Sequence, residues 1–268
     1  NNEIINGSYG MYFYGGSSTS LENKTIVTNN TFENQYTYAI RLYYQNAPTV
    51  SGNIINGHPT NASYYGIYLG YCDNELVVSK NKVIIPAGGY GIEIYYCDAT
   101  PGKRGLIVNN FVQIGGTSTA YGLYPYYATY QDFYYNSINI TSTSATSGRA
   151  MYLYSGCSGI NVKNNVLANN GGGYSFYCSV TTAGLVSSDY NDLYTTGANL
   201  AYWTANRADL AAWQAISLLD SNSVTANPNY TSTTDLHTFT SSLNGYATPI
   251  AGITDDIDGE ARDASTPD

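Results

Sequence analysis

The sequence is poor in charged residues, which make up only 11% of its 268 positions. Ten Lys and Arg stand against nineteen Asp and Glu, so the net charge is −9. Nucleic-acid binding needs clustered Lys and Arg that neutralise phosphates, and this balance argues against a nucleic-acid partner. No apolar run approaches the roughly 18 residues of a membrane-spanning helix, and we expect a chain that does not span a membrane.

The sequence also lacks the signature of a metal site. Its four Cys form no CxxC pair, and its only two His, His58 and His237, lie far from them. Zinc sites are usually built from closely spaced Cys and His, so we predict no such site and no bound cofactor. The chain opens inside a repeat at "NNEIING", and we therefore expect a signal peptide and further repeats upstream.

Tyrosine and glycine are abundant, with thirty and twenty-seven copies, and many of the tyrosines fall in a repeated stretch of six residues. Successive copies begin 25 to 31 residues apart, which is the period of a solenoid. The copies are "YGMYFY" from residue 9, "YAIRLY" from 38, "YGIYLG" from 65, "YGIEIY" from 90, "YGLYPY" from 121, "RAMYLY" from 149 and "YSFYCS" from 174.

A second motif keeps the same period. An Asn followed two residues later by an apolar residue recurs between the copies, and this independent column supports the repeat. Its members are Asn2, Asn30, Asn53, Asn81, Asn110, Asn136, Asn165 and Asn191.

Within each copy the apolar residues alternate with a period of two, which predicts β-strands. The same alternation predicts that the intervening residues, such as Gly66 and Tyr68, face outward. A coil with at least two such strands cannot bury its own apolar face, so the coils must stack at about 4.8 Å. The predicted inward columns are Met11, Ile40, Ile67, Ile92, Leu123, Met151 and Phe176, and Phe13, Leu42, Leu69, Ile94, Pro125, Leu153 and Cys178.

Over residues 1–194 these motifs resemble the right-handed, pectate-lyase-like parallel β-helix repeat family. The resemblance implies an all-β fold, a right-handed parallel β-helix of about seven to eight coils formed by a single chain. In that family the Asn side chains of successive coils stack in the turns and bond one another's backbones. Asn tolerates left-handed backbone conformations, which suits such turns.

The repeat stops after Tyr194, and we predict that residues 195–268 form a C-terminal capping region. Asn206 is a plausible N-cap, with Asp209 in the first turn, for a short helix over "LAAWQAI". Such a helix would cover the last coil, whose unpaired backbone would otherwise be a template for aggregation.

The segment "DDIDGEARD" resembles the C-terminal region of secreted bacterial β-helix proteins of the choice-of-anchor type. Asp256, Ile257, Asp258, Gly259 and Arg262 carry the match. The resemblance implies a secreted or cell-surface bacterial protein. The segment is either a solvated acidic turn, with Arg262 bridging to a carboxylate, or a Ca²⁺ loop with alternating oxygen ligands.

Catalysis would need a base beside a cation site or two carboxylates about 5–9 Å apart. Asp73 and Asp98 follow equivalent Cys residues on adjacent coils, and Arg104 lies nearby in sequence. Stacked carboxylates raise one another's pKa and can hold a cation, so these three residues are the catalytic candidates. The alternative is that both aspartates are ordinary turn residues. Because no lyase motif matches, we favour a protein that is not an enzyme.

The two Cys of this repeat, Cys72 and Cys97, occupy one position of adjacent coils. Stacked Cα atoms lie within the range that a disulfide permits. A Cys72–Cys97 disulfide and two free thiols in the core are equally compatible with the sequence. Cys157 and Cys178 do not share a register.

The residues between the inward columns form predicted outward columns that are rich in tyrosine. Tyr rings can contact sugar C–H groups and their hydroxyls can donate hydrogen bonds, but stacked rings could equally serve only to stabilise the sheet. The first column is Tyr12, Arg41, Tyr68, Glu93, Tyr124, Tyr152 and Tyr177; the second is Tyr14, Tyr43, Gly70, Tyr95, Tyr126, Tyr154 and Ser179; a third, at the strand ends, is Tyr44, Tyr71, Tyr96 and Tyr127.

The sequence favours a secreted or surface binding or adhesion module whose tyrosines contact a polysaccharide or a surface protein. One alternative is a polysaccharide lyase or glycoside hydrolase that uses Asp73 and Asp98. Another is a structural component of an extracellular assembly that self-associates through its tyrosine-rich face.

Overall fold

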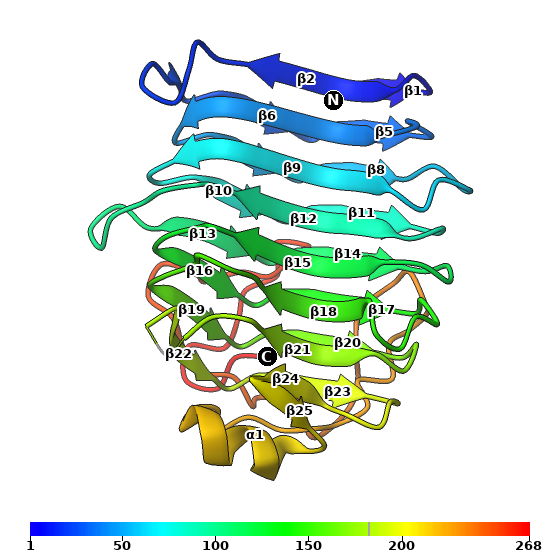
Figure 1. The fold of residues 1–268 in the computed structure, drawn as a ribbon, viewed down its shortest axis with the longest axis vertical. Helices are drawn as coiled ribbons and strands as arrows, with labels where there is room; N and C mark the ends of the chain where they lie inside the picture. Colours follow the sequence, from blue (N-terminus) through cyan, green and yellow to red (C-terminus); the bar gives the residue numbers. More distant parts are fainter. Residues whose placement is uncertain (182) are drawn as a thin grey trace.

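The computed structural model describes residues 1–181 and 183–268 as a parallel β-solenoid of about seven turns (Figure 1). Each complete turn contributes one strand to each of three sheets, and the strands of successive turns pair in parallel. The predicted fold class is confirmed. The sequence indicated at least two strands in each coil, and the structure has three.

The largest sheet contains ten strands, runs down the front of the molecule in Figure 1, and is called here the tyrosine sheet. Its strands are β2 (Tyr9–Tyr14), β3 (Glu22–Asn23), β6 (Tyr38–Asn46), β9 (Tyr64–Asp73), β12 (Gly89–Tyr95), β15 (Ala120–Tyr126), β18 (Gly148–Leu153), β21 (Tyr174–Cys178), β24 (Ala201–Trp203) and β25 (Ala205–Arg207).

Two smaller sheets complete each turn, and we call them the second and the third sheet. The second sheet consists of β4 (Ile26–Thr28), β7 (Thr49–Ser51), β10 (Val77–Ser79), β13 (Gly105–Val108), β16 (Gln131–Tyr134), β19 (Ile160–Lys163) and β22 (Leu185–Asp189). The third sheet consists of β1 (Glu3–Ile5), β5 (Thr31–Glu33), β8 (Ile54–Asn56), β11 (Lys82–Ile85), β14 (Phe111–Ile114), β17 (Ser137–Ile140), β20 (Val166–Asn169) and β23 (Asp192–Thr195).

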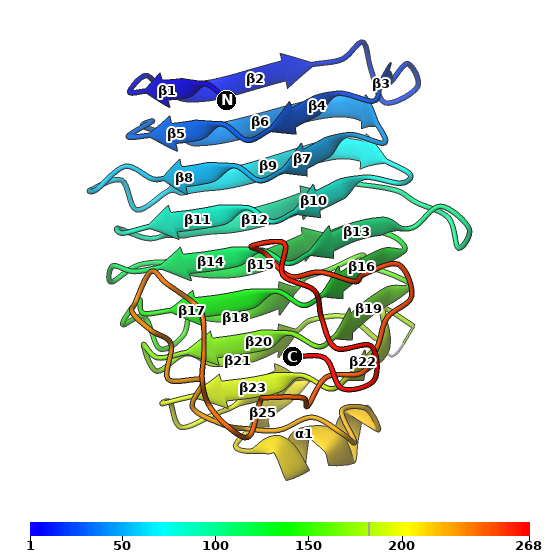
Figure 2. The ribbon, with the colours of Figure 1, turned by 180° about the vertical axis from the view of Figure 1, so that it is seen from behind.

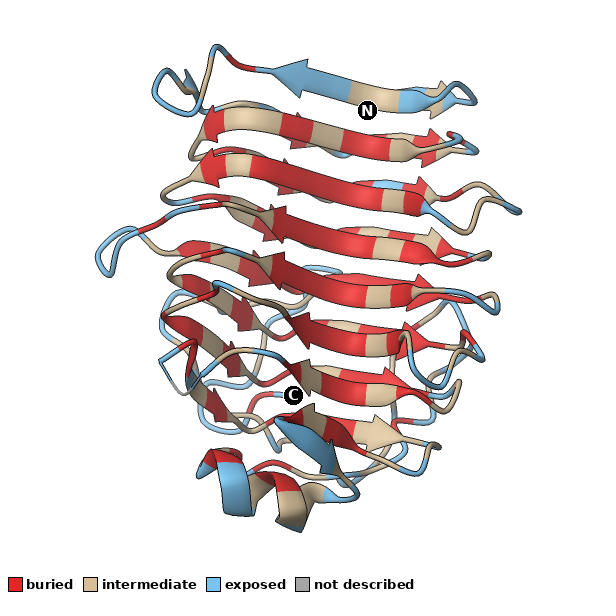
Figure 3. Ribbon diagram, viewed as in Figure 1, coloured by how far each residue is buried: buried red, intermediate tan, exposed pale blue. Residues whose placement is uncertain are grey.

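The core fills the space between the three sheets. Both predicted inward columns are in register along the tyrosine sheet, with Ile67 paired to Ile92 and Leu69 to Ile94. Their side chains are buried from the second coil onward, whereas Phe13 in the first coil is exposed. Figure 3 shows this change from the exposed first coil to the buried interior. The alternating pattern therefore identified the core correctly.

The prediction that Gly66 faces outward is wrong. A Cβ on Gly66 would lie 2.6 Å from the Cγ1 atom of the core residue Val83, so this position faces the interior. The alternation of inward and outward residues is interrupted here: Gly66 and Ile67 both face the interior. Tyr65, just before them, lies on the outer face. The missed signal was the Tyr that opens most copies of the repeat. It forms a further outward column with Arg149: Tyr9, Tyr38, Tyr65, Tyr90, Tyr121, Arg149 and Tyr174.

The predicted Asn column forms a continuous ladder in the turn between the second and third sheets. From Asn2 to Asn165, each Asn donates from its backbone N–H and its Nδ2 to the Oδ1 of the Asn on the next coil, at 2.9–3.2 Å. The left-handed backbone lies one residue earlier, for example at Asn109 (φ 56°) and Asn164 (φ 58°). The ladder Asn is therefore needed for its side-chain amide and not for a left-handed backbone, because the amide forms hydrogen bonds with buried backbone groups.

The C-terminal end of the solenoid is covered by β24, β25 and the helix α1 (Leu210–Ser217). The N-cap is Asp209, whose carboxylate accepts from Ala212 N–H at 2.8 Å. The predicted N-cap Asn206 instead lies in β25, because residues 205–207 turn back and pair antiparallel with β24. Trp213 of α1 is fully buried against Phe176, so the helix covers the last coil as expected.

Residues 228–268, called here the strap, run back along the outside of the second and third sheets (Figure 2). Tyr230 donates to Ile138 O at 3.1 Å and Tyr135 donates to Thr248 O at 2.8 Å. Lys80 of the fourth coil pairs with Asp255 at 2.6 Å. The end of the chain therefore spans several coils laterally, which the repeat pattern did not predict.

Candidate functional site

The outer face of the tyrosine sheet carries its tyrosines in four columns along the solenoid axis. The middle column is in the predicted register, from Tyr12 through Arg41, Tyr68 and Glu93 to Tyr124. Its members lie outside the core, yet Tyr68 is only 7% and Tyr124 9% exposed because rings of the adjacent columns cover them. An outward-pointing side chain on this sheet is therefore not always exposed to solvent.

The flanking columns are half-exposed and supply the accessible tyrosine surface. Tyr96 stacks on Tyr127 with ring centroids 4.6 Å apart, and Tyr65 stacks on Tyr90 at 4.3 Å. Such pairs add about 0.5–1.5 kcal/mol each beyond burial. The ring planes of Tyr95 and Tyr96 make an angle of 70°, so the accessible tyrosine surface presents rings in different orientations.

The strand-end column has an unusual backbone conformation. All four of its tyrosines are left-handed: Tyr44 (φ 55°), Tyr71 (φ 51°), Tyr96 (φ 49°) and Tyr127 (φ 51°). A bulky residue with positive φ is rare and costs on the order of 1–3 kcal/mol. Gly or Asn would adopt this conformation with less strain, so tyrosine at these positions carries a backbone cost.

Three charged residues interrupt the tyrosines. The guanidinium of Arg41 lies 4.8–5.9 Å from five surrounding ring centroids, and that of Arg149 lies 3.6 Å from the centroid of Tyr177. Glu93 is 5% exposed, and its Oε2 has no hydrogen-bond partner among the described residues. Burial raises the pKa of Glu93 to about 8, so its carboxyl group is mostly protonated at neutral pH.

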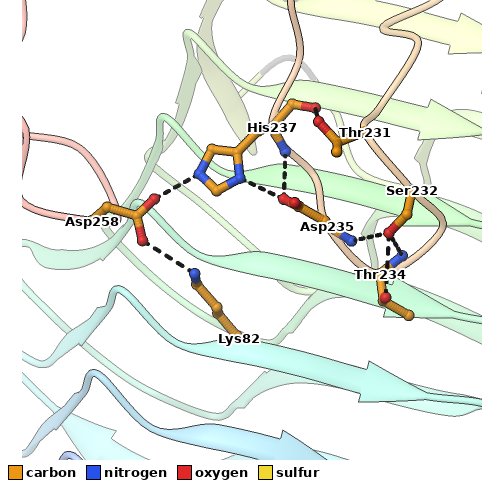
Figure 4. A network of polar contacts seen from close by, with 7 residues as sticks. All are labelled: Lys82, Thr231, Ser232, Thr234, Asp235, His237 and Asp258. Atoms are coloured by element: carbon orange, nitrogen blue, oxygen red, sulfur yellow. Dashed lines mark hydrogen bonds and ion pairs between the residues drawn. The ribbon is translucent and has the colours of Figure 1, made fainter.

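The opposite flank is organised by a polar network between the strap and β11 (Figure 4). Asp258 accepts from Lys82 Nζ at 3.1 Å and from His237 Nε2 at 2.6 Å, and Asp235 bonds His237 Nδ1. Burial acts to lower the pKa of His237, but the two carboxylates outweigh it and the pKa lies above its ordinary value. We call His237, Asp235, Asp258 and Lys82 the clasp.

The clasp should loosen as pH rises. Its charged His237 contributes fully below about pH 6.5, and that contribution is lost as pH passes the raised pKa. The lowered pKa values of Asp235 and Asp258 mean that their contribution is lost only in strong acid. Half-exposed pairs contribute roughly 0.2–1 kcal/mol. We expect hydrogen-exchange protection factors of the strap to fall about two- to fivefold between pH 5.5 and 8.5.

The His237→Gln variant should have low protection that no longer depends on pH in this range. His58→Gln is the matched control, because His58 lies in the β8–β9 loop and bonds only nearby residues. Equal pH dependence in the wild type and in His237→Gln would contradict the role of the clasp.

The three catalytic candidates are engaged in local structural contacts. Asp73 Oδ1 accepts from Asp98 N–H at 2.9 Å, and Asp98 Oδ1 accepts from Thr129 at 3.1 Å. Arg104 donates to Asp132 of β16 at 2.7 Å and to the backbone oxygen of Gly159, just before β19, at 2.6 Å. The aspartates are neighbours as predicted, and the guanidinium is directed to a different carboxylate.

The structure has all four Cys as free, buried thiols. The sulfur of Cys97 accepts from Cys72 N–H at 3.3 Å, so the two residues stack in one column as the repeat predicted. Cys178 pairs in register with Leu153 and is therefore out of register with Cys157.

The acidic C-terminal segment is held against the solenoid by its carboxylates. Asp255 pairs with Lys80, and Asp256 Oδ1 accepts from Glu260 N–H at 2.8 Å. Arg262 donates to Asn109 Oδ1 at 3.0 Å and to the backbone oxygen of Asp255 at 3.2 Å, and its guanidinium lies 4.0 Å from the ring centroid of Tyr135. The predicted bridge from Arg262 to a carboxylate is therefore wrong: the guanidinium donates to a backbone carbonyl and to a side-chain amide.

These features define an all-β parallel β-solenoid with an Asn ladder. The family described as periplasmic copper-binding protein (NosD) matches residues 1–152, and the chain belongs to that family. This membership is consistent with a periplasmic or extracellular location. Within residues 1–181 and 183–268, no helix has the length and apolarity needed to cross a bilayer. Comparison with curated proteins and with solved structures gives no match.

The residues of this chain do not fit the copper named in the family description. Copper prefers imidazole, thiolate and thioether ligands. Both nitrogens of His237 are bonded to carboxylates, and the thiols are buried in the core. Across the part of the chain that the structure describes, no three His, Cys, Asp or Glu side chains come together as a metal site.

Proposed function

We propose that this chain is an extracytoplasmic binding module whose tyrosine sheet contacts polysaccharide chains or a surface protein. The observation that carries the proposal is a continuous aromatic face that no described segment covers, whereas the strap covers the opposite flank (Figures 1 and 2). Large uncovered aromatic surfaces usually mark contact sites.

The left-handed tyrosines support the same proposal. Backbone strain that is kept through several coils is typical of functional positions. The regular spacing of rings and hydroxyls along the axis suits an extended ligand that repeats along its own length. Tyr also loses little side-chain entropy on binding, because it has few rotatable bonds. A glycan is therefore the first ligand class to test.

The test replaces Tyr95 and Tyr126 together by Ser, because both are half-exposed members of a flanking column. We expect retention on a glycan array to fall at least about tenfold, since each aromatic contact contributes on the order of 1 kcal/mol. Tyr36→Ser is the matched control, because Tyr36 is 58% exposed and lies off the tyrosine sheet. Circular dichroism would confirm that both variants fold.

Unchanged retention in the double variant, or equal loss in Tyr36→Ser, would overturn the glycan proposal. Growth of particle size with concentration that the double variant abolishes would instead indicate self-association through the same face. Release of oligosaccharide products that Asp73→Ala abolishes would indicate an enzyme.

A further inference from the structure

A cavity of about 520 Å³ lies between the strap and the outer side of the solenoid. Its wall on the solenoid side includes Phe111 and Val166 of the third sheet and the left-handed turn residues Tyr135 and Tyr190. Leu236 and Tyr246 line it from the strap. This volume is in the range of small-molecule sites, which are mostly apolar with a few placed polar groups.

One polar group in the wall has an unsatisfied atom. Asp192, the first residue of β23, is 3% exposed, and its Oδ1 accepts from Ala226 N–H at 2.8 Å. Its Oδ2 is buried and has no hydrogen-bond partner among the described residues. A buried carboxylate oxygen without a partner is costly, so the site is set up to accept a donor.

The cationic residues that line the cavity do not serve Asp192. Arg262 is directed to Asn109 and to the backbone of Asp255, and His237 is held between Asp235 and Asp258. The phenol of Tyr230, whose pKa is raised by burial and further by the nearby charge of Asp192, donates to Ile138 O. The other two carboxylates in the lining, Asp256 and Asp268, interact with the charge of Arg262. The carboxylate of Asp192 therefore has no cation of its own beside the aromatic walls.

We propose that this cavity is a binding site for a small organic ammonium ion whose charged nitrogen bonds Asp192 Oδ2 and whose apolar body packs against the aromatic walls. An ammonium supplies both the missing donor and the missing positive charge, and aromatic faces attract cations. The site is separate from the tyrosine sheet, so the glycan test and this one can fail independently.

The probe is phenethylammonium chloride, titrated into the full chain by isothermal calorimetry at pH 8 and constant ionic strength. Burial raises the pKa of Asp192 to about 7, so at pH 8 most of its carboxyl groups are ionised. We expect saturable binding by the wild type. The Asp192→Asn variant keeps the acceptor for Ala226 N–H and should bind at least tenfold more weakly.

Three controls make the result specific. Glu260→Gln removes one exposed charge from the strap and should bind like the wild type. The Val166→Phe variant fills the cavity without altering Asp192, and it should also weaken binding. The neutral analogue 2-phenylethanol should bind at least tenfold more weakly than the ammonium.

No saturable binding by the wild type, equal weakening by Glu260→Gln, or equal affinity for 2-phenylethanol would each overturn the proposal. Retained affinity in a folded Val166→Phe variant would place the ligand outside the cavity and would overturn it as well.

Discussion

Replacing Asp220 by Ala should lower the free energy of unfolding by about 3–5 kcal/mol, one of the largest effects expected from a single side chain here. Asp220 is buried and lies at the end of the Asn ladder. Its carboxylate accepts from Asn191 Nδ2 at 3.0 Å, from Trp213 Nε1 at 2.7 Å, and from the hydroxyls of Ser188 and Ser223. Removing it leaves several buried donors unpaired.

The backbone adds to this effect. Asp220 has a left-handed conformation (φ 59°), which Asp tolerates better than Ala. Denaturant unfolding followed by tryptophan fluorescence is the appropriate measurement, because both tryptophans, Trp203 and Trp213, lie at this end of the solenoid. Circular dichroism on the same samples would follow the whole chain, and the two transitions should separate if the end unfolds first.

Asp209→Ala is the matched control, because Asp209 caps the same helix from the surface. Loss of an N-cap costs typically about 1 kcal/mol. If Asp220→Ala lowers the free energy of unfolding no more than Asp209→Ala does, the ladder does not depend on Asp220 at its end.

Replacing Glu93 by Gln should stabilise the protein at pH 8 by on the order of 3–5 kcal/mol, and should change little at pH 5. The pKa of Glu93 rises from its ordinary value of 4.5 to about 8 because the carboxyl is buried among tyrosines. Between these values the folded state holds a proton that the unfolded state has lost, so stability falls as pH rises. Gln resembles the protonated acid and has no charge to bury.

The measurement is the difference in unfolding free energy between Glu93→Gln and the wild type across pH 4–9. The difference isolates Glu93 from Asp192 and His237, whose titrations also change stability with pH. Glu75→Gln, in an exposed turn, is the control and should give a flat difference. Parallel curves for the wild type and Glu93→Gln would show that this carboxyl is not buried in solution.

The tyrosine sheet and the flank covered by the strap are stabilised by different kinds of contact. The tyrosine sheet is stabilised by ring contacts that recur from coil to coil, such as the stacked Tyr65 and Tyr90 and the edge-to-face Tyr90 and Tyr121. The strap is fixed by single contacts with different partners at each coil, including Lys80 and Tyr135. We propose a long ligand for the first kind of surface and a small one for the cavity beside the second.

Several site residues could not be found from the sequence for specific reasons. The direction of Gly66 depends on a break in alternation that follows from packing against Val83. The burial of Tyr68 depends on the rings of adjacent columns, which the alternation rule ignores. Asp192 follows a ladder Asn like other third-sheet residues, and its surroundings depend on the segment after α1, whose Val224 and Ala226 lie against it.

The sequence by itself determined the strands, the two inward columns and the Asn ladder. Every coil repeats the same local contacts, and this repetition gives the sequence a period that can be recognised. Only the tertiary structure decided where the strap lies, which residue terminates the ladder, and which carboxyls are buried. These features arise once along the chain, from contacts between segments as distant as Lys80 and Asp255. A contact that is not repeated leaves no period in the sequence, and its geometry depends on the packing of the whole solenoid.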